Sequence, residues 1–117
     1  MTDIYNTLYT VLDADDWSNY GSQPIIMDDY IYDGDALGED FINIIPGERN
    51  HVLSGTNSIA FTRTSAFIEI KATTKANRDK LYQDVKDALG SSYRLLSESL
   101  DNEAGYYLRI IEVELLE

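Results

Sequence analysis

The stretch from Ser58 to Leu89 constrains the fold of this chain more than any other, because it has the pattern of a strand followed by an amphipathic helix. Alternating apolar residues predict one long strand across 58–72, since successive side chains of a strand point to opposite faces. The apolar parity changes around Thr64 and Ser65. That change indicates a twist, a bulge, or a strand covered on different faces along its length.

A helix is predicted to follow, across 75–89. Thr73 and Thr74 offer hydroxyl groups that can cap its first turn, and Gly90 stands where a left-handed C-terminal cap is usual. Polar residues cover one side of the helix, and we expect the other side to pack on a sheet. That apolar side recurs at helical spacing and consists of Leu81, Val85, Ala88 and Leu89.

The remaining elements are shorter. An apolar stripe predicts a helix across 3–12, and a polar loop follows across 13–23. Trp17 and Tyr20 are large for such a loop, so we expect them to fold back on the body or to contact a partner. Further strands are predicted at 24–32, 41–45, 48–53, 93–98 and 106–116, with turns at 33–40, 46–47, 54–57 and 101–105.

These elements predict an α+β fold in one domain, 1–117. The fold has one mainly antiparallel sheet, with an N-terminal helix and a second helix (about 75–89) packed on it. No cysteine is present, which excludes disulfides and thiolate metal sites. No apolar run is long enough for a transmembrane helix, and no secretory signal is expected at the start.

The charge is strongly negative and unevenly distributed. Asp and Glu number 21 against 9 Lys and Arg, for a net charge of −12. Residues 1–48 contain eleven acids and no Lys or Arg, whereas 49–117 are nearly neutral. A negative half repels phosphate backbones, which argues against a direct grip on nucleic acid. A solubilising surface or a salty habitat explains the same excess.

No catalytic motif is found. His51 is the only histidine, and no Gly-x-Ser-x-Gly elbow accompanies it. No phosphate-binding loop occurs either. We therefore expect a protein without enzymatic activity and without a cofactor.

The acidic turn 33–40 invites a comparison with calcium loops. An EF-hand that began at Asp33 would need oxygen ligands where the chain has Leu37 and Ile44, so the template fails. We expect no resident metal, and a solvated acidic turn is the simpler interpretation. A looser divalent site stays open as the alternative, on Asp28, Asp29, Asp33 and Asp35.

The order of elements has four features that occur together in one family. A short helix, Ile4 to Leu12, comes first, and the apolar stretch 41–49 ends in a Pro-Gly turn. A long strand then leads into the helix 75–90, and a hairpin closes the chain. This order resembles that of the tail terminator (tail completion) proteins of long-tailed bacteriophages and related archaeal viruses. The resemblance covers nearly the whole length but includes no single decisive motif.

The resemblance implies a virion structural protein. Proteins of this kind form a ring, commonly hexameric, that caps the tail tube and joins it to the head-tail connector. The implied partners are further copies of the chain, the tail tube protein and the connector or adaptor, and the implied location is the head-tail interface of a virion assembled in the host cytoplasm. DNA would pass without specific binding.

Two alternatives remain at this stage. Another head-tail joining protein, an adaptor or a stopper, shares the same general build. A small ligand-binding regulatory α+β domain belongs to a different class, and it would show a closed apolar pocket with convergent polar groups.

Two further expectations concern surfaces. Segments that project beyond a sheet often pair with a neighbour, so we predict assembly contacts in 46–59 and in the hairpin 98–107. An acidic channel wall would repel a DNA duplex over about 8–10 Å and let it slide. We therefore predict that some acids of the first half face such a channel, from the set Asp28, Asp29, Asp33, Asp35, Glu39 and Asp40.

Overall fold

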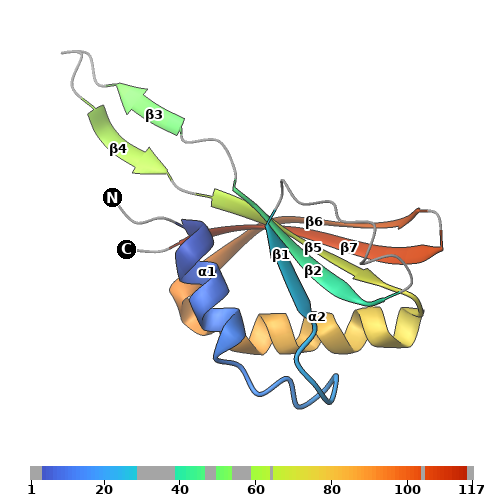
Figure 1. Cartoon of the computed structure of the whole chain (residues 1–117). Helices are drawn as coiled ribbons and strands as arrows, with labels where there is room; N and C mark the ends of the chain where they lie inside the picture. The colour runs from blue at the N-terminus through green and yellow to red at the C-terminus, as the bar shows by residue number, and fades with distance from the viewer. Residues whose placement is uncertain are drawn as a thin grey trace.

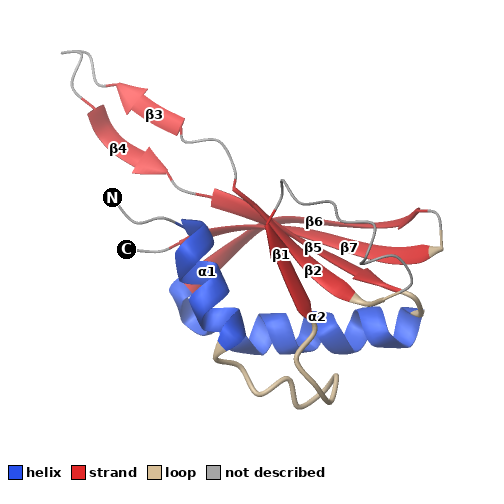
Figure 2. Ribbon diagram, viewed as in Figure 1, coloured by secondary structure: helices blue, strands red, loops and turns tan. Residues whose placement is uncertain are grey.

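The computed structural model describes residues 4–28, 39–46, 50–53, 59–63, 65–103 and 105–115. Within them, a five-stranded sheet has two helices on one face, and a separate two-stranded sheet extends away from it (Figure 1; Figure 2). The α+β fold is confirmed. Neither described helix has both the length and the apolar character needed to cross a membrane.

The five-stranded sheet has the order β1-β2-β5-β7-β6. All neighbours pair antiparallel except β1 and β2, which are parallel, so the sheet is mainly antiparallel as predicted. The last strand of the chain lies between β5 and β6, and this leaves β1 and β6 as the two edges. The strands are β1 (Ile25–Asp28), β2 (Phe41–Pro46), β5 (Ser65–Ala72), β6 (Tyr93–Glu103) and β7 (Tyr106–Leu115).

The two helices are α1 (Ile4–Asp13) and α2 (Lys75–Leu89), close to the predicted ranges. The Oγ1 atom of Thr74 accepts a hydrogen bond from the backbone N–H of Asn77 at 3.1 Å, which caps the start of α2. Gly90 ends α2 at a φ of 56°, and its N–H donates to the carbonyl of Lys86. The predicted N-terminal cap is therefore confirmed at Thr74. Gly90 ends the helix at a positive φ, but its ψ of −143° is not that of the predicted left-handed cap, and a short 3-10 turn (Gly90–Ser92) follows α2.

The main core lies between the helices and the sheet. The predicted apolar side of α2 faces it, since Leu81, Val85 and Leu89 are buried. Full burial of such a side chain stabilises a fold by roughly 1.5–3 kcal/mol. The sheet and α1 supply most of the other buried members, among them Leu8, Leu12, Ile42, Ile44, Ile68, Ile70 and Val113.

The opposite face of the sheet holds a smaller cluster. Phe41, Tyr106 and Leu108 are buried there, and the rings of Phe41 and Tyr106 meet edge to face with centroids 5.6 Å apart. The start of β7 therefore has buried aromatic and aliphatic side chains on the face away from the helices.

The prediction of one strand across 58–72 is wrong. β4 (Ile59–Arg63) pairs with β3 (Asn50–Leu53) in the two-stranded sheet, whereas β5 pairs with β2 and β7 in the main sheet. The change of apolar parity near Thr64 marks the passage from one sheet to the other. Ala66, Ile68 and Ile70 of β5 are buried in the main core, which accounts for the alternation along that strand.

The closing hairpin is also longer than predicted. We expected the strand to end at Glu98 and a loop across 101–105, but β6 continues to Glu103 and pairs with Tyr106. The polar residues near the turn stay in the ladder because an edge strand keeps them in contact with solvent while its backbone remains paired. Gly105, at a φ of 91°, occupies the turn.

Candidate functional site

The polar loop 14–24 is anchored on the body by Trp17. The Trp17 side chain is fully buried, and its Nε1 atom donates to the carbonyl of Leu12 at 3.0 Å, near the end of α1. Trp17 also has a φ of 53°, which is unusual for a residue other than glycine. Trp17 therefore folds back on the body, the first of the two roles expected for it.

Asp84 on α2 holds the same loop from the other side. Its side chain is 2% exposed, and each carboxylate oxygen accepts hydrogen bonds from the loop. Oδ1 accepts from the backbone N–H and the amide of Asn19, at 3.1 and 2.8 Å, and Oδ2 accepts from the N–H of Tyr20 at 2.8 Å. A buried carboxylate normally needs such donors, so Asp84 fixes the loop onto the helix.

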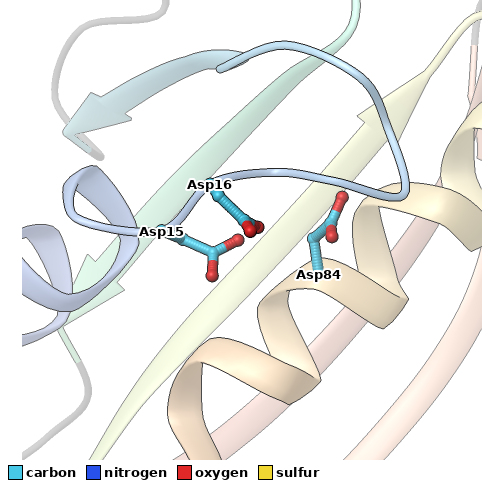
Figure 3. A group of neighbouring side chains, drawn as sticks. All are labelled: Asp15, Asp16 and Asp84. Atoms are coloured by element: carbon cyan, nitrogen blue, oxygen red, sulfur yellow. The ribbon is translucent and has the colours of Figure 1, made fainter.

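Asp15, Asp16 and Asp84 form the one group of acids in the described part of the chain that could hold a cation (Figure 3). One oxygen of each lies within 4.8 Å of the others. Asp15 accepts from the N–H of Trp17 at 3.0 Å, and Asp16 accepts from the N–H of Ser18 at 3.1 Å. Backbone N–H groups thus bind all three carboxylates, which stabilise the turns of the loop and hold it on α2.

A second polar network surrounds Asp40, just before β2. Its Oδ1 atom accepts from the backbone N–H and the hydroxyl of Thr73, at 2.8 and 3.0 Å. Its Oδ2 atom accepts from the hydroxyl of Tyr20 at 2.7 Å and from the amide of Asn77 at 2.8 Å. Asp40 therefore joins the loop 14–24, the start of β2 and the first turn of α2.

Burial opposes the ionisation of Asp40, but the donors of Thr73, Tyr20 and Asn77 outweigh it, so the pKa of Asp40 lies below its ordinary value. Burial and the hydrogen bond to the Asp40 carboxylate raise the pKa of Tyr20 to about 12. The pair is thus a carboxylate and a neutral phenol across the physiological range. A hollow of about 350 Å³ lies beside the network, and its lining is mostly polar: Tyr20, Ser22, Gln23, Pro24, Ile25, Glu39, Asp40 and Thr73.

Asp40→Asn should lower the free energy of unfolding at pH 7 by about 2 kcal/mol, because a charged acceptor of four hydrogen bonds is replaced. The folded-state pKa of Asp40 lies below the unfolded value of about 3.9, so its contribution is present above pH 4 and is lost as the pH falls through the folded-state pKa. Urea denaturation from pH 7 to pH 2 should show the gap between wild type and variant narrowing below about pH 4.

Glu39→Gln is the matched control for this measurement, because Glu39 is exposed and adjacent. It should leave the unfolding free energy close to that of the wild type at every pH. A gap for Asp40→Asn that stayed constant down to pH 2 would contradict the assignment.

The structure places only part of the predicted acidic set. Glu39 is exposed, and Asp40 is half-buried in the network above. Asp28 ends β1, but its side chain lies outside the described part, as do Asp29, Asp33 and Asp35, which were also the alternative divalent site. Whether these acids line a channel stays a prediction. Sequence reasoning missed Asp84, although its position three residues after Leu81 places it beside the apolar side of α2.

The edge strand β6 borders a second hollow, of about 190 Å³, between α2 and the helix-covered face of the sheet. Its lining is mostly apolar and includes Tyr82, Leu89, Tyr93, Leu95, Ile111 and Val113. The Tyr93 hydroxyl is buried and has no hydrogen-bond partner among the described residues, and burial raises the pKa of that phenol.

The two-stranded sheet of β3 and β4, hereafter the arm, is the other distinctive surface. It contains His51, the only histidine, in β3, and the side chains of both strands lie outside the described part. Of the segment 46–59 that was predicted to make assembly contacts, the arm contains 50–53 and Ile59, and residues 47–49 and 54–58 lie outside the described part. A scan of known protein families and a search of characterised proteins find no match to this chain.

Proposed function

We propose that this chain is a tail-terminator-like virion structural protein, which assembles into a ring that caps a tail tube and joins it to the head-tail connector. It acts by assembly and not by catalysis. The ring is expected to be hexameric, as in the family that the order of elements resembles, and its location is the head-tail interface of a virion. An adaptor or stopper role at the same junction is the alternative within this class.

The arm is the observation that carries the proposal. Among the described strands, β3 and β4 pair only with each other, and they project away from the main sheet (Figure 1). A two-stranded sheet is marginally stable at best in water unless something packs on it or extends it. A projecting arm of this kind therefore favours assembly with further copies.

The position of the arm in the topology supports the same conclusion. β2 and β5 pair as far as Pro46 and Ala66, and the arm is the continuation of this hairpin beyond the sheet. β1 flanks β2 and β7 flanks β5, but neither continues along the arm. The main fold is thus complete without the arm, which leaves the arm available for a partner.

The hollow beside Asp40 does not favour the competing ligand-binding class. It is open and mostly polar, and its central carboxylate is engaged by four donors of the chain itself. A regulatory domain would be supported by a closed apolar pocket with polar groups directed into it.

Removal of the arm should abolish self-association and leave the monomer folded. We would replace residues 47–65 by Asn-Gly, which forms a two-residue turn between the paired residues Pro46 and Ala66. Native mass spectrometry should show multiples of the 13.3 kDa chain for the wild type and the single chain for the variant. Circular dichroism and thermal unfolding check that the variant keeps its fold.

Association should be measured at several salt concentrations, because copies with a charge of −12 repel one another at low ionic strength. Light scattering across increasing salt should show stronger association. Electron micrographs of the assembled protein should show rings with a central opening. A wild-type chain that stays monomeric at every salt and protein concentration would overturn the proposed function.

A further inference from the structure

We infer that the edge strand β6 and the hollow beside it receive the arm of a second copy, by addition of an arm strand to the sheet edge. This inference rests on the proposed ring and specifies its subunit contact. The arm and the edge belong to different surfaces of one copy, so each copy can give an arm to one neighbour and receive an arm from another.

The first argument is the edge itself. β6 is an edge of eleven residues, against four in β1, and no described strand pairs with its outer side. Unpaired backbone N–H and C=O groups along such an edge are a template for another strand. Strand addition uses these groups for affinity and neighbouring pockets for specificity.

The second argument concerns charge. Charged residues often protect an edge against association. On β6, however, Arg94 contacts Glu114 at 2.7 Å and Glu98 contacts Arg109 at 2.9 Å. Both partners belong to β7, so these charges are paired across the sheet. They leave the middle of the edge less protected than its composition suggests.

The third argument is the position of two leucines. Leu95 and Leu100 are the most exposed large apolar side chains in the described part, at 50% and 59%. Leu95 pairs with Val113, and Leu100 pairs with Arg109, whose guanidinium lies 3.4 Å from the ring centre of Tyr82 on α2. Both leucines therefore lie on the helix-covered face, along the flank of α2.

The hollow between β6 and α2 lies on this same face and has Leu95 on its border. A strand added to β6 would direct alternate side chains toward it. The edge thus offers backbone pairing and an apolar surface together, which is the combination that strand addition requires.

The arm is the occupant to which these features point. Its strands have four and five residues, and their register sets Val52 opposite Phe61 and Leu53 opposite Ile59. Five of its nine strand residues are apolar, namely Val52, Leu53, Ile59, Ala60 and Phe61, and among the described strands it has no third neighbour. Docking on β6 of a neighbour would give it one, and it would cover exposed leucines at the same time.

This contact is heterologous, because the arm of one copy meets the edge of the next. Heterologous contacts form a closed ring when the rotation between copies closes, and an open filament when it does not. An arm-to-edge contact of this kind would connect every copy of the proposed ring to its two neighbours, because each copy gives one arm and receives one.

Cysteine cross-linking tests the inference directly, since the chain has no native cysteine. Thr62→Cys in β4 is combined with Ser97→Cys or Ser99→Cys in β6, and the oxidised proteins are compared on non-reducing gels. At least one pair should give a series of bands at covalent multiples of the chain, and these bands should disappear when a reducing agent is added. Thr62→Cys with Ser18→Cys, an exposed position in the loop 14–24, is the control and should stay a single chain.

A second variant tests the apolar contact. Leu95→Lys with Leu100→Lys changes two exposed positions, so the monomer should keep its fold while the dissociation constant rises about tenfold or more. Ile25→Lys is the matched control, because Ile25 is 41% exposed on the opposite edge strand. It should leave association unchanged.

The outcomes separate the two proposals. Two results would overturn the docking site and leave the proposed ring intact. In the first, the wild type assembles but no β6 cysteine cross-links to the arm. In the second, Ile25→Lys dissociates the assembly and the leucine variant does not. A covalent dimer from Ser99→Cys alone would show edge-to-edge pairing and would also overturn it. A wild type that never associates would overturn both.

Discussion

Val85→Asp should lower the free energy of unfolding by about 3–5 kcal/mol. Val85 is fully buried on α2, between the helix and the sheet, so the new carboxylate would lose its water without gaining a partner. Small domains have a total stability of roughly 5–15 kcal/mol, and the variant should therefore be largely unfolded on mild heating. Urea denaturation followed by circular dichroism measures the loss.

Lys86→Asp is the matched control for this prediction. Lys86 is the next residue of α2 and is exposed, so the same side chain is introduced on the solvent side of the helix. It should change the unfolding free energy only slightly. Equal effects of the two substitutions would show that the inward side of α2 has been assigned incorrectly.

Trp17→Ala should have a comparable effect, a loss of about 3–5 kcal/mol. Trp17 is the largest fully buried side chain in the described part, and its removal leaves a cavity between the loop 14–24 and the core. The carbonyl of Leu12 near the end of α1 would also lose the indole N–H as its donor. Chemical denaturation gives the size of the loss.

Trp17→Phe separates packing from the hydrogen bond, because it keeps an aromatic ring and removes the indole N–H. It should destabilise by less than Trp17→Ala, since part of the cavity is filled. If both variants were as stable as the wild type, the loop would not depend on this anchor. Its attachment would then rest on Asp84 and Asp40 alone.

The two carboxylates Asp40 and Asp84 show how an acidic chain uses part of its charge. Both accept several hydrogen bonds from the loop 14–24 or from α2, and so they hold the loop and the helix together. Exposed acids such as Glu39 are a different group, because they add negative charge to the surface of the protein. Only the exposed population is relevant to the predicted channel.

Local patterns in the sequence determined the helices. The spacing of Leu81, Val85 and Leu89, with Thr74 before the helix and Gly90 after it, predicted the limits of α2 and its buried side, because caps and periodicity act within a few residues. The same local signals indicated the α+β class and located most strands. They needed no knowledge of what each strand pairs with.

Only the tertiary structure decided the pairings. The split of 58–72 into β4 and β5, the parallel direction of β1 and the insertion of β7 beside β5 depend on contacts between residues far apart in the chain. The same is true of Asp84, a polar residue of α2 that is buried because the loop around Asn19 and Tyr20 brings donors to it. The alternation of apolar and polar residues in a strand indicates which of its faces is buried. The element that packs on that face is determined by the folding of the whole chain.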